Sequence, residues 1–184
     1  VPERDDHHAL HEEVGLAGYF VASVAQVFLH LRMLGGEQVE ELLVGVEPTG
    51  FYPYPRFLAL LTAVAKRFRD MDPVLEQLGM QLMADWYEHG PGRQQVTSGV
   101  DFLKFQTGSA GYRSVVQGPP AAVGEFTLEA IDEQAGTARV RSTTPFPKAI
   151  ERGILLGGMR APGDLTFVDV DNAADPLVFN VTFR

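Results

Sequence analysis

Apolar residues recur at helical spacing through the first hundred residues of the chain. The first such set lies within residues 16–31, and the pair Gly35-Gly36 ends it. The same spacing predicts further helices over residues 37–44, 55–68, 73–87 and 100–106. Proline is tolerated in the first turn of a helix, so Pro73 can begin the helix over residues 73–87 with Asp72 as its N-cap. Thr97 or Ser98 is a suitable N-cap for the helix over residues 100–106. The sequence therefore predicts about five helices in the first 115 residues.

The pattern changes to alternation after residue 124. Apolar positions alternate with polar ones over residues 126–130, a turn follows at 133–136, and alternation resumes over 138–142, which predicts a β-hairpin. Pro145 and Pro147 precede a helix that we expect to end near Gly157 and Gly158. Two more strands are expected over residues 165–170 and 177–183.

These elements predict an α+β fold in a single domain, residues 1–184. A helical bundle over residues 1–115 is followed by a four-stranded, mostly antiparallel sheet over residues 116–184, with one helix inserted between the strand pairs. We expect a ligand cavity between the bundle and the sheet.

Composition excludes several classes of function. The chain has no cysteine, so disulfides, thiolate metal sites and a cysteine nucleophile are excluded, and a cytoplasmic location is expected. Lys and Arg total 15 against 24 Asp and Glu, and a net charge of -9 repels nucleic acid and anionic lipid. The longest apolar run, residues 18–31, is too short to span a bilayer. Since the chain begins at Val1 without a signal-peptide pattern, we expect a processed protein or part of a longer one.

Histidines are the candidate metal ligands. His30 lies on or beside the apolar face of the first helix, and His89 follows the fourth helix, so either could ligate a haem iron, although a lone histidine is more often structural. His7 and His11 have the i, i+4 spacing of a metal site, but a polar terminus without a second ligand cluster is more often frayed.

No catalytic motif is present. The sequence contains no G-x-S-x-G elbow, P-loop or dinucleotide fingerprint. Residues 153–158 are glycine-rich, but they fall within the predicted helix end, so close packing and capping explain them better than phosphate binding. The acidic pair Asp169 and Asp171 is expected to be solvated. We therefore expect a binding domain rather than an enzyme.

An aromatic-rich set of residues predicts a pocket for a small apolar or planar ligand. Large aromatic side chains and methionine commonly line such pockets, with a few polar groups for orientation. The expected ligand contacts are His30, Tyr54, Phe57, Met83, Trp86, Tyr87, Phe102, Phe105, Tyr112 and Arg141.

Three stretches together resemble the H-NOX (haem nitric oxide/oxygen binding) superfamily and its bacterial relatives. They are GEQVEELLVGVEPTGFYPYPRFLALLTAVAK, LGMQLMADWYEHG, and RVRSTTPFPKAIERGILLGGMRAPGDLTFVDV with the closing LVFNVTFR. Vinyl-reductase-type small-molecule sensor domains have a similar closing strand-helix-strand pattern. The resemblance implies an H-NOX-like sensor domain in signalling that holds a small ligand and acts on an output domain or a second copy of itself.

The chain departs from the H-NOX pattern where haem would bind. Haem-binding members carry a Y-x-S-x-R motif that contacts the haem propionates, and residues 140–144 here read VRSTT, so only Ser142 is kept. Their axial histidine lies in the helix before the sheet, whereas residues 102–110 contain no histidine. The resemblance thus implies a domain in which haem is not the favoured cofactor, and if haem binds, His30 or His89 would ligate its iron.

Three other functions remain open from the sequence. The first is a haem-binding gas sensor with that non-standard axial ligand, and the second is a dimerisation or interaction module whose aromatic residues are only core. The third is an enzyme acting on a planar substrate, for which the candidate acid, base or charged groups are Tyr112, His30, His89 and Arg141.

Overall fold

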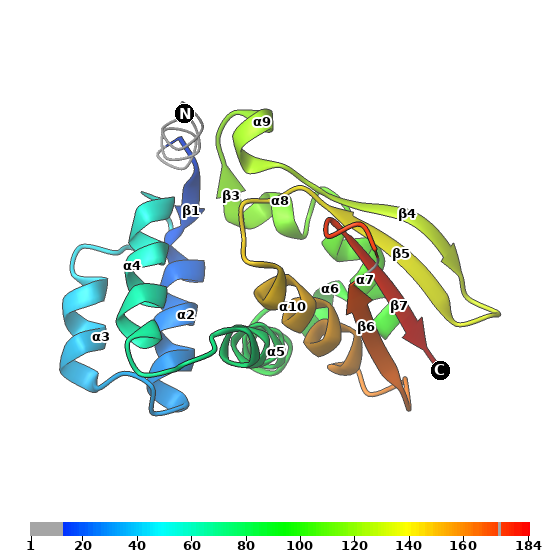
Figure 1. Ribbon diagram of the computed structural model, residues 1–184, viewed down its shortest axis with the longest axis horizontal. Helices are drawn as coiled ribbons and strands as arrows, with labels where there is room; N and C mark the ends of the chain where they lie inside the picture. The colour runs from blue at the N-terminus through cyan, green and yellow to red at the C-terminus, as the bar shows by residue number, and fades with distance from the viewer. Residues whose placement is uncertain (1–12, 173) are drawn as a thin grey trace. The chain divides into compact units, whose positions relative to one another are not determined.

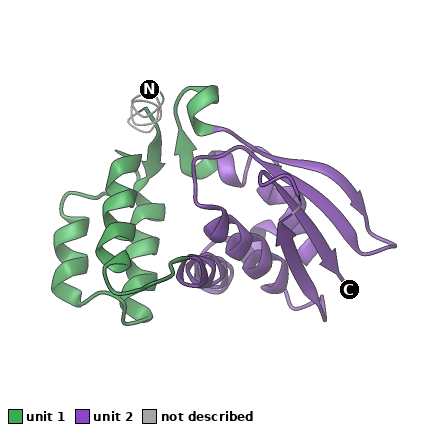
Figure 2. Cartoon of the chain, viewed as in Figure 1, with its two compact units in different colours: residues 1–71, 114–123 green, residues 72–113, 124–184 purple. Residues whose placement is uncertain are grey.

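The computed structural model describes residues 13–172 and 174–184 (Figure 1). The chain forms two compact units (Figure 2). Unit 1 contains the chain up to residue 71 together with residues 114–123, and unit 2 contains residues 72–113 and 124–184. The combination of helices with antiparallel sheets confirms the predicted α+β class. No helix in the described part of the chain is both long and apolar enough to cross a membrane.

Unit 1 combines helices with a small sheet. Its elements are β1 (Gly15–Ala17), α2 (Gly18–His30), α3 (Gly36–Leu43), β2 (Phe51–Pro53), α4 (Tyr54–Ala65), β3 (Val116–Gln117) and α9 (Pro120–Val123). The strands pair antiparallel in the order β2-β1-β3. Helices α2 and α4 each bury an apolar stripe, which includes Val24 and Phe28 on α2 and Leu60 and Val64 on α4. Burial of these stripes forms the core of the unit.

Unit 2 combines the predicted sheet with further helices. Its elements are α5 (Asp72–His89), α6 (Gly92–Gln95), α7 (Gly99–Gln106), β4 (Phe126–Asp132), β5 (Thr137–Ser142), α10 (Lys148–Arg160), β6 (Val168–Asn172) and β7 (Val178–Phe183), and α8 (Tyr112–Val115) begins in it. The strand order is β4-β5-β7-β6 and every neighbouring pair is antiparallel. Helix α10 packs against α5, α7 and β6. The predicted four-stranded sheet with one inserted helix is therefore confirmed.

Glycines let α5 and α10 approach closely. A Cβ atom on Gly79 of α5 would lie 2.3 Å from the carbonyl oxygen of Ile150. A Cβ atom on Gly153 would lie 2.1 Å from the carbonyl oxygen of Glu76, and one on Gly157 would lie 2.6 Å from Cα of Met80. Side chains at these positions would force the two helices apart, so the glycine-rich segment serves close packing as the sequence indicated.

Several boundaries and elements differ from the sequence predictions. The inserted helix, which was expected to end near Gly157 and Gly158, runs two residues further, to Arg160. The three-stranded sheet of unit 1 was not predicted, since its strands are only two or three residues long. The predicted cap at Ser98 is confirmed: its Oγ accepts a hydrogen bond from the backbone N–H of Asp101 at 3.0 Å.

Candidate functional site

The expected ligand-contacting residues fall into separate groups in the structure. Tyr54 and Phe57 lie in the core of unit 1, where their ring centroids are 5.5 Å apart. The ring centroid of Phe57 also lies 6.0 Å from that of Phe20. Both side chains are almost fully buried, at 1% and 0% exposure. In this unit the aromatic pattern therefore forms hydrophobic core.

A second group surrounds Trp86 in unit 2. The Trp86 ring stacks on Phe105 with centroids 5.3 Å apart, and it meets the edge of Phe102 at 6.1 Å. Phe102 is fully buried, and its ring occupies the space that a Cβ atom on Gly158 would need, since the nearest ring atom is 2.0 Å away. Trp86 and Phe105 are only half-buried. This group, which we call the Trp86 cluster, thus has a buried side and an accessible side.

Met83 and Tyr87 extend the accessible side of the Trp86 cluster along α5. Both are half-buried, and the Arg93 guanidinium lies over the Tyr87 ring, 5.4 Å from its centroid. Gly92 makes this arrangement possible, because a Cβ atom there would lie 2.5 Å from Cα of Tyr87 and 2.8 Å from the Trp86 ring. Met83, Trp86 and Tyr87 are thus half-buried side chains of one helix, Trp86 stacks on Phe105, and the ion pair of Arg93 with Glu88 lies beside Tyr87.

Tyr112 belongs to a third group. Its ring lies 5.7 Å from Phe126 and 6.1 Å from Phe146, and all three side chains are buried in unit 2. The sequence did not single out the two phenylalanines as its partners, because they are separated from it by 14 and 34 residues along the chain. Tyr112 thus packs apart from the Trp86 cluster.

Arg141 lies on the solvent-facing side of the sheet. Its guanidinium pairs with Glu129 and donates to Asp175 Oδ2 at 2.9 Å, and Glu129 also accepts from Arg139 at 2.8 Å. The hydrogen bond to Asp175, followed by that to Glu129, raises the pKa of Arg141. Two carboxylates already engage this guanidinium, which explains its position without a ligand.

The two histidines proposed as haem ligands lie at helix ends. His30 is the last residue of α2 in unit 1 and His89 is the last residue of α5 in unit 2, and both are exposed. Among the residues that the structure describes, no group of three His, Asp or Glu side chains is placed to hold a metal ion. His7 and His11 lie outside the described residues. A haem-ligating role for His30 or His89 stays a prediction.

The stretch at residues 140–144 contributes to a buried polar cluster that the sequence did not reveal. Ser142 Oγ donates to Glu151 Oε1 at 2.6 Å, and the Thr144 hydroxyl donates to the same oxygen. Lys148 Nζ donates to Glu151 Oε2 at 2.7 Å and to Ser142 Oγ at 3.1 Å. Glu151 is only 1% exposed. Burial raises the pKa of the Glu151 carboxyl, and the charge of Lys148 acts in the opposite direction.

One signal in the sequence could have pointed to this cluster. Glu151 stands between Ile150 and Ile154, on the face of α10 that the apolar pattern assigns to the core. An acidic residue on such a face needs partners, and Lys148 three residues earlier is one of them. The hydroxyl partners come from the end of β5 and the loop after it, which the helical pattern alone does not identify.

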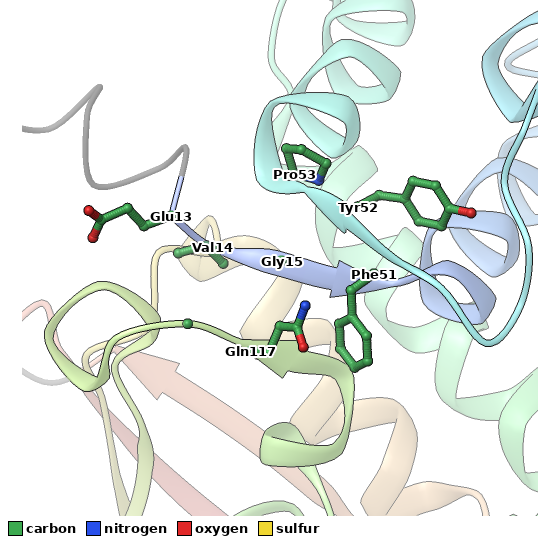
Figure 3. Close-up of a pocket in the computed structure, with 8 residues that line it drawn as sticks. Glu13, Val14, Gly15, Phe51, Tyr52, Pro53 and Gln117 are labelled. Carbon is green, nitrogen blue, oxygen red and sulfur yellow. The ribbon is translucent and has the colours of Figure 1, made fainter.

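A surface pocket of about 360 Å³ lies on the small sheet of unit 1 (Figure 3). In this view the side chains of Phe51 from β2 and Gln117 from β3 lie toward the same side of the sheet, and the side chain of Tyr52 points away from them. Gly15 forms part of the floor, since a Cβ atom there would lie 2.9 Å from Gln117 Cγ. The lining residues are Glu13, Val14, Gly15, Phe51, Tyr52, Pro53, Gln117 and Gly118. None of them is among the ten ligand contacts predicted from the sequence.

Comparison with solved structures identifies the fold. A structure described as probing haem distortion in the H-NOX family superposes with a TM-score of 0.68 at 13% identity, covering 92% of this chain and 95% of that chain. An oxygen-binding H-NOX domain related to soluble guanylate cyclases gives 0.67 at 12% identity, with the same coverages. The Fe(II) unliganded H-NOX protein from K. algicida gives 0.64 at 14% identity, covering 92% and 97%. No protein-family model matches the chain, and no curated protein matches it. The chain therefore has an H-NOX-like fold, divergent in sequence.

Proposed function

We propose that this chain, with its H-NOX-like fold, is a non-catalytic sensory or regulatory domain that binds a small apolar or planar ligand. The observation that carries the proposal is the similarity of fold over 92% of the chain to domains described as oxygen-binding and as Fe(II) proteins. Fold alone does not determine the ligand, so its chemistry is argued from the residues of this chain.

The Trp86 cluster supports an apolar, planar ligand. Its accessible side presents Met83, Trp86, Tyr87 and Phe105, which are the side chains that stack on flat ligands and adapt to their outline. The net charge of -9 favours a neutral or cationic ligand over an anionic one. The location between helical bundle and sheet that the sequence suggested stays a prediction.

The polar groups beside the cluster support binding rather than catalysis. Asp85 Oδ1 accepts a hydrogen bond from Gln81 at 2.9 Å, and Glu88 pairs with Arg93. Each of these carboxylates is thus already engaged by a neighbouring side chain. The enzyme alternative with Tyr112, His30, His89 and Arg141 has no support from their contacts. Tyr112 packs on Phe126 and Phe146, Arg141 pairs with Glu129 and Asp175, and His30 and His89 are exposed at helix ends.

The residues present do not fit haem bound in the manner of haem-binding H-NOX domains. Helix α7 and the turn after it offer no axial histidine, and Val140 stands where the motif has tyrosine. Ser142, the residue that is kept, donates its hydroxyl to Glu151 instead of being available to a propionate. These observations support a ligand other than haem.

Titration with N-phenyl-1-naphthylamine, a neutral aromatic probe that fluoresces in apolar sites, tests the proposal. Trp86 is the single tryptophan of the chain, so quenching of its emission as probe emission rises reports probe bound within energy-transfer distance of it, and the Phe105 variant locates the site. We expect saturable binding that Phe105→Ala weakens by about two- to tenfold, because a stacked aromatic pair contributes roughly 0.5–1.5 kcal/mol. Phe68→Ala removes an exposed phenylalanine in unit 1 and is the matched control.

Two results would contradict the proposal. One is probe binding that fails to saturate or leaves Trp86 emission unchanged, and the other is equal weakening by the Phe105 and Phe68 variants.

A partner in signalling, either a second copy of the chain or an output domain, remains part of the proposal. Sedimentation of the protein over a range of concentrations tests whether two copies associate.

A further inference from the structure

The polar cluster of Ser142, Thr144, Lys148 and Glu151 has the composition of a carboxylate-binding site. Two hydroxyls and one ammonium surround the Glu151 carboxylate: Ser142 and Thr144 donate to Oε1, and Lys148 donates to Oε2. These are the charge-assisted hydrogen bonds by which proteins hold the acid group of a ligand. Here the carboxylate comes from the chain itself.

The cluster is also complete. Lys148 Nζ further donates to the backbone carbonyl and the hydroxyl of Ser142, both at 3.1 Å, and Thr144 Oγ1 accepts from the backbone N–H of Phe146 at 3.3 Å. Across the described residues, every buried side-chain nitrogen or oxygen has a hydrogen-bond partner. A second carboxylate would meet the charge of Glu151 with no further cation of the cluster to balance it.

We infer that Glu151 occupies, from within the chain, a site whose lining would otherwise bind the carboxylate of a small organic acid. Ser142 is the residue that the H-NOX pattern places against a haem propionate, so in this chain Glu151 supplies the acid group that a propionate would supply. The junction between β5 and α10 is thereby completed without any ligand. The inference concerns unit 2 alone and does not rest on the ligand proposed for the Trp86 cluster.

Removing the internal carboxylate provides the test. Glu151→Ala keeps Cβ and removes Cγ and the carboxyl group, so the space left beside two hydroxyls and an ammonium has the size of acetate, and sodium acetate is the probe that fits it. We expect the variant to melt about 5 to 10 °C below the wild type, because its buried donors lose their acceptor. Acetate at millimolar concentration should recover at least half of that loss in a saturable manner, whereas sodium chloride at equal ionic strength should not.

Matched variants separate a carboxylate site from a general loss of packing. In the Ser142→Ala, Glu151→Ala double variant the recovery by acetate should disappear, because one of its donors is gone. The wild type and the isosteric Glu151→Gln variant should not respond, because their site is filled. An equal response of Glu151→Ala to acetate and to chloride would overturn the inference, and so would an equal response of the wild type.

Refolding yield replaces the melting temperature if Glu151→Ala does not fold in plain buffer. The variant is then refolded from urea with sodium acetate or with sodium chloride, and Glu151→Gln serves as the folded reference. A higher yield with acetate supports the inference. Equal yields with the two salts would overturn it, and neither result depends on whether the Trp86 cluster binds N-phenyl-1-naphthylamine.

Discussion

Gly153→Ala should destabilise the protein by separating α5 from α10. The new Cβ atom would lie 2.1 Å from the carbonyl oxygen of Glu76, a distance at which the backbone of one helix must move. Overpacking of this kind costs about 3 kcal/mol or more at its upper end. Replacing glycine by alanine inside a helix returns about 1 kcal/mol through helix propensity. The net loss is therefore about 2 kcal/mol.

Thermal unfolding followed by far-ultraviolet circular dichroism measures this loss. For a chain of this size, about 2 kcal/mol corresponds to a fall in melting temperature of about 4–8 °C. Gly36→Ala is the matched control, because Gly36 is the first residue of α3 and a Cβ atom there would meet nothing within 4 Å. If Gly153→Ala were as stable as Gly36→Ala, the close approach of the two helices would be refuted.

Three further predictions test the cap, the polar cluster and the sheet surface. Ser98→Ala should lower the free energy of unfolding by about 1 kcal/mol through loss of the α7 cap, measured by urea unfolding, whereas Ser109→Ala in the exposed turn after α7 should not change it. Because the pKa of Glu151 is raised in the folded protein, its contribution to stability is complete below the unfolded value and is lost as the pH rises through the folded one. Melting temperatures should therefore show the wild type losing stability relative to Glu151→Gln as the pH rises from about 4, and an unchanged difference would contradict the shift. Arg141→Ala should leave the affinity for N-phenyl-1-naphthylamine unchanged in the same fluorescence titration, because its guanidinium is engaged by Glu129 and Asp175, and weakened binding would place it at the ligand.

The long elements of the fold could be predicted because their periodicity extends over several turns. Helix α4 shows Phe57, Leu61 and Val64 at helical spacing, and β5 alternates buried Ala138 and Val140 with exposed Arg139. Strands β1, β2 and β3 are too short to show any period, and they form a sheet only because residues 15–17 meet residues 51–53 and 116–117 across the chain. Such pairing is a tertiary property that a local pattern does not contain.

The candidate site could be predicted only in part, for a similar reason. Trp86 of α5 and Phe102 and Phe105 of α7 were in the predicted set, and the structure brings their rings into contact. The same signal included Tyr54 and Phe57, which the structure places in the core of unit 1, because aromatic residues serve as core and as pocket lining alike. Glu151 was missed because its hydroxyl partners reach it through the packing of β5 against α10, which no spacing along the chain encodes.

Reconstitution with haemin tests the proposal that the H-NOX-like fold of this chain holds a ligand other than haem. The purified wild-type protein is mixed with one equivalent of haemin, passed through a gel-filtration column, and its absorbance spectrum is recorded. We expect haemin to separate from the protein and the protein fraction to show no Soret band, since α7 provides no axial histidine and the Ser142 hydroxyl is hydrogen-bonded to Glu151. A sharp Soret band that elutes with the protein at one haem per chain would contradict it.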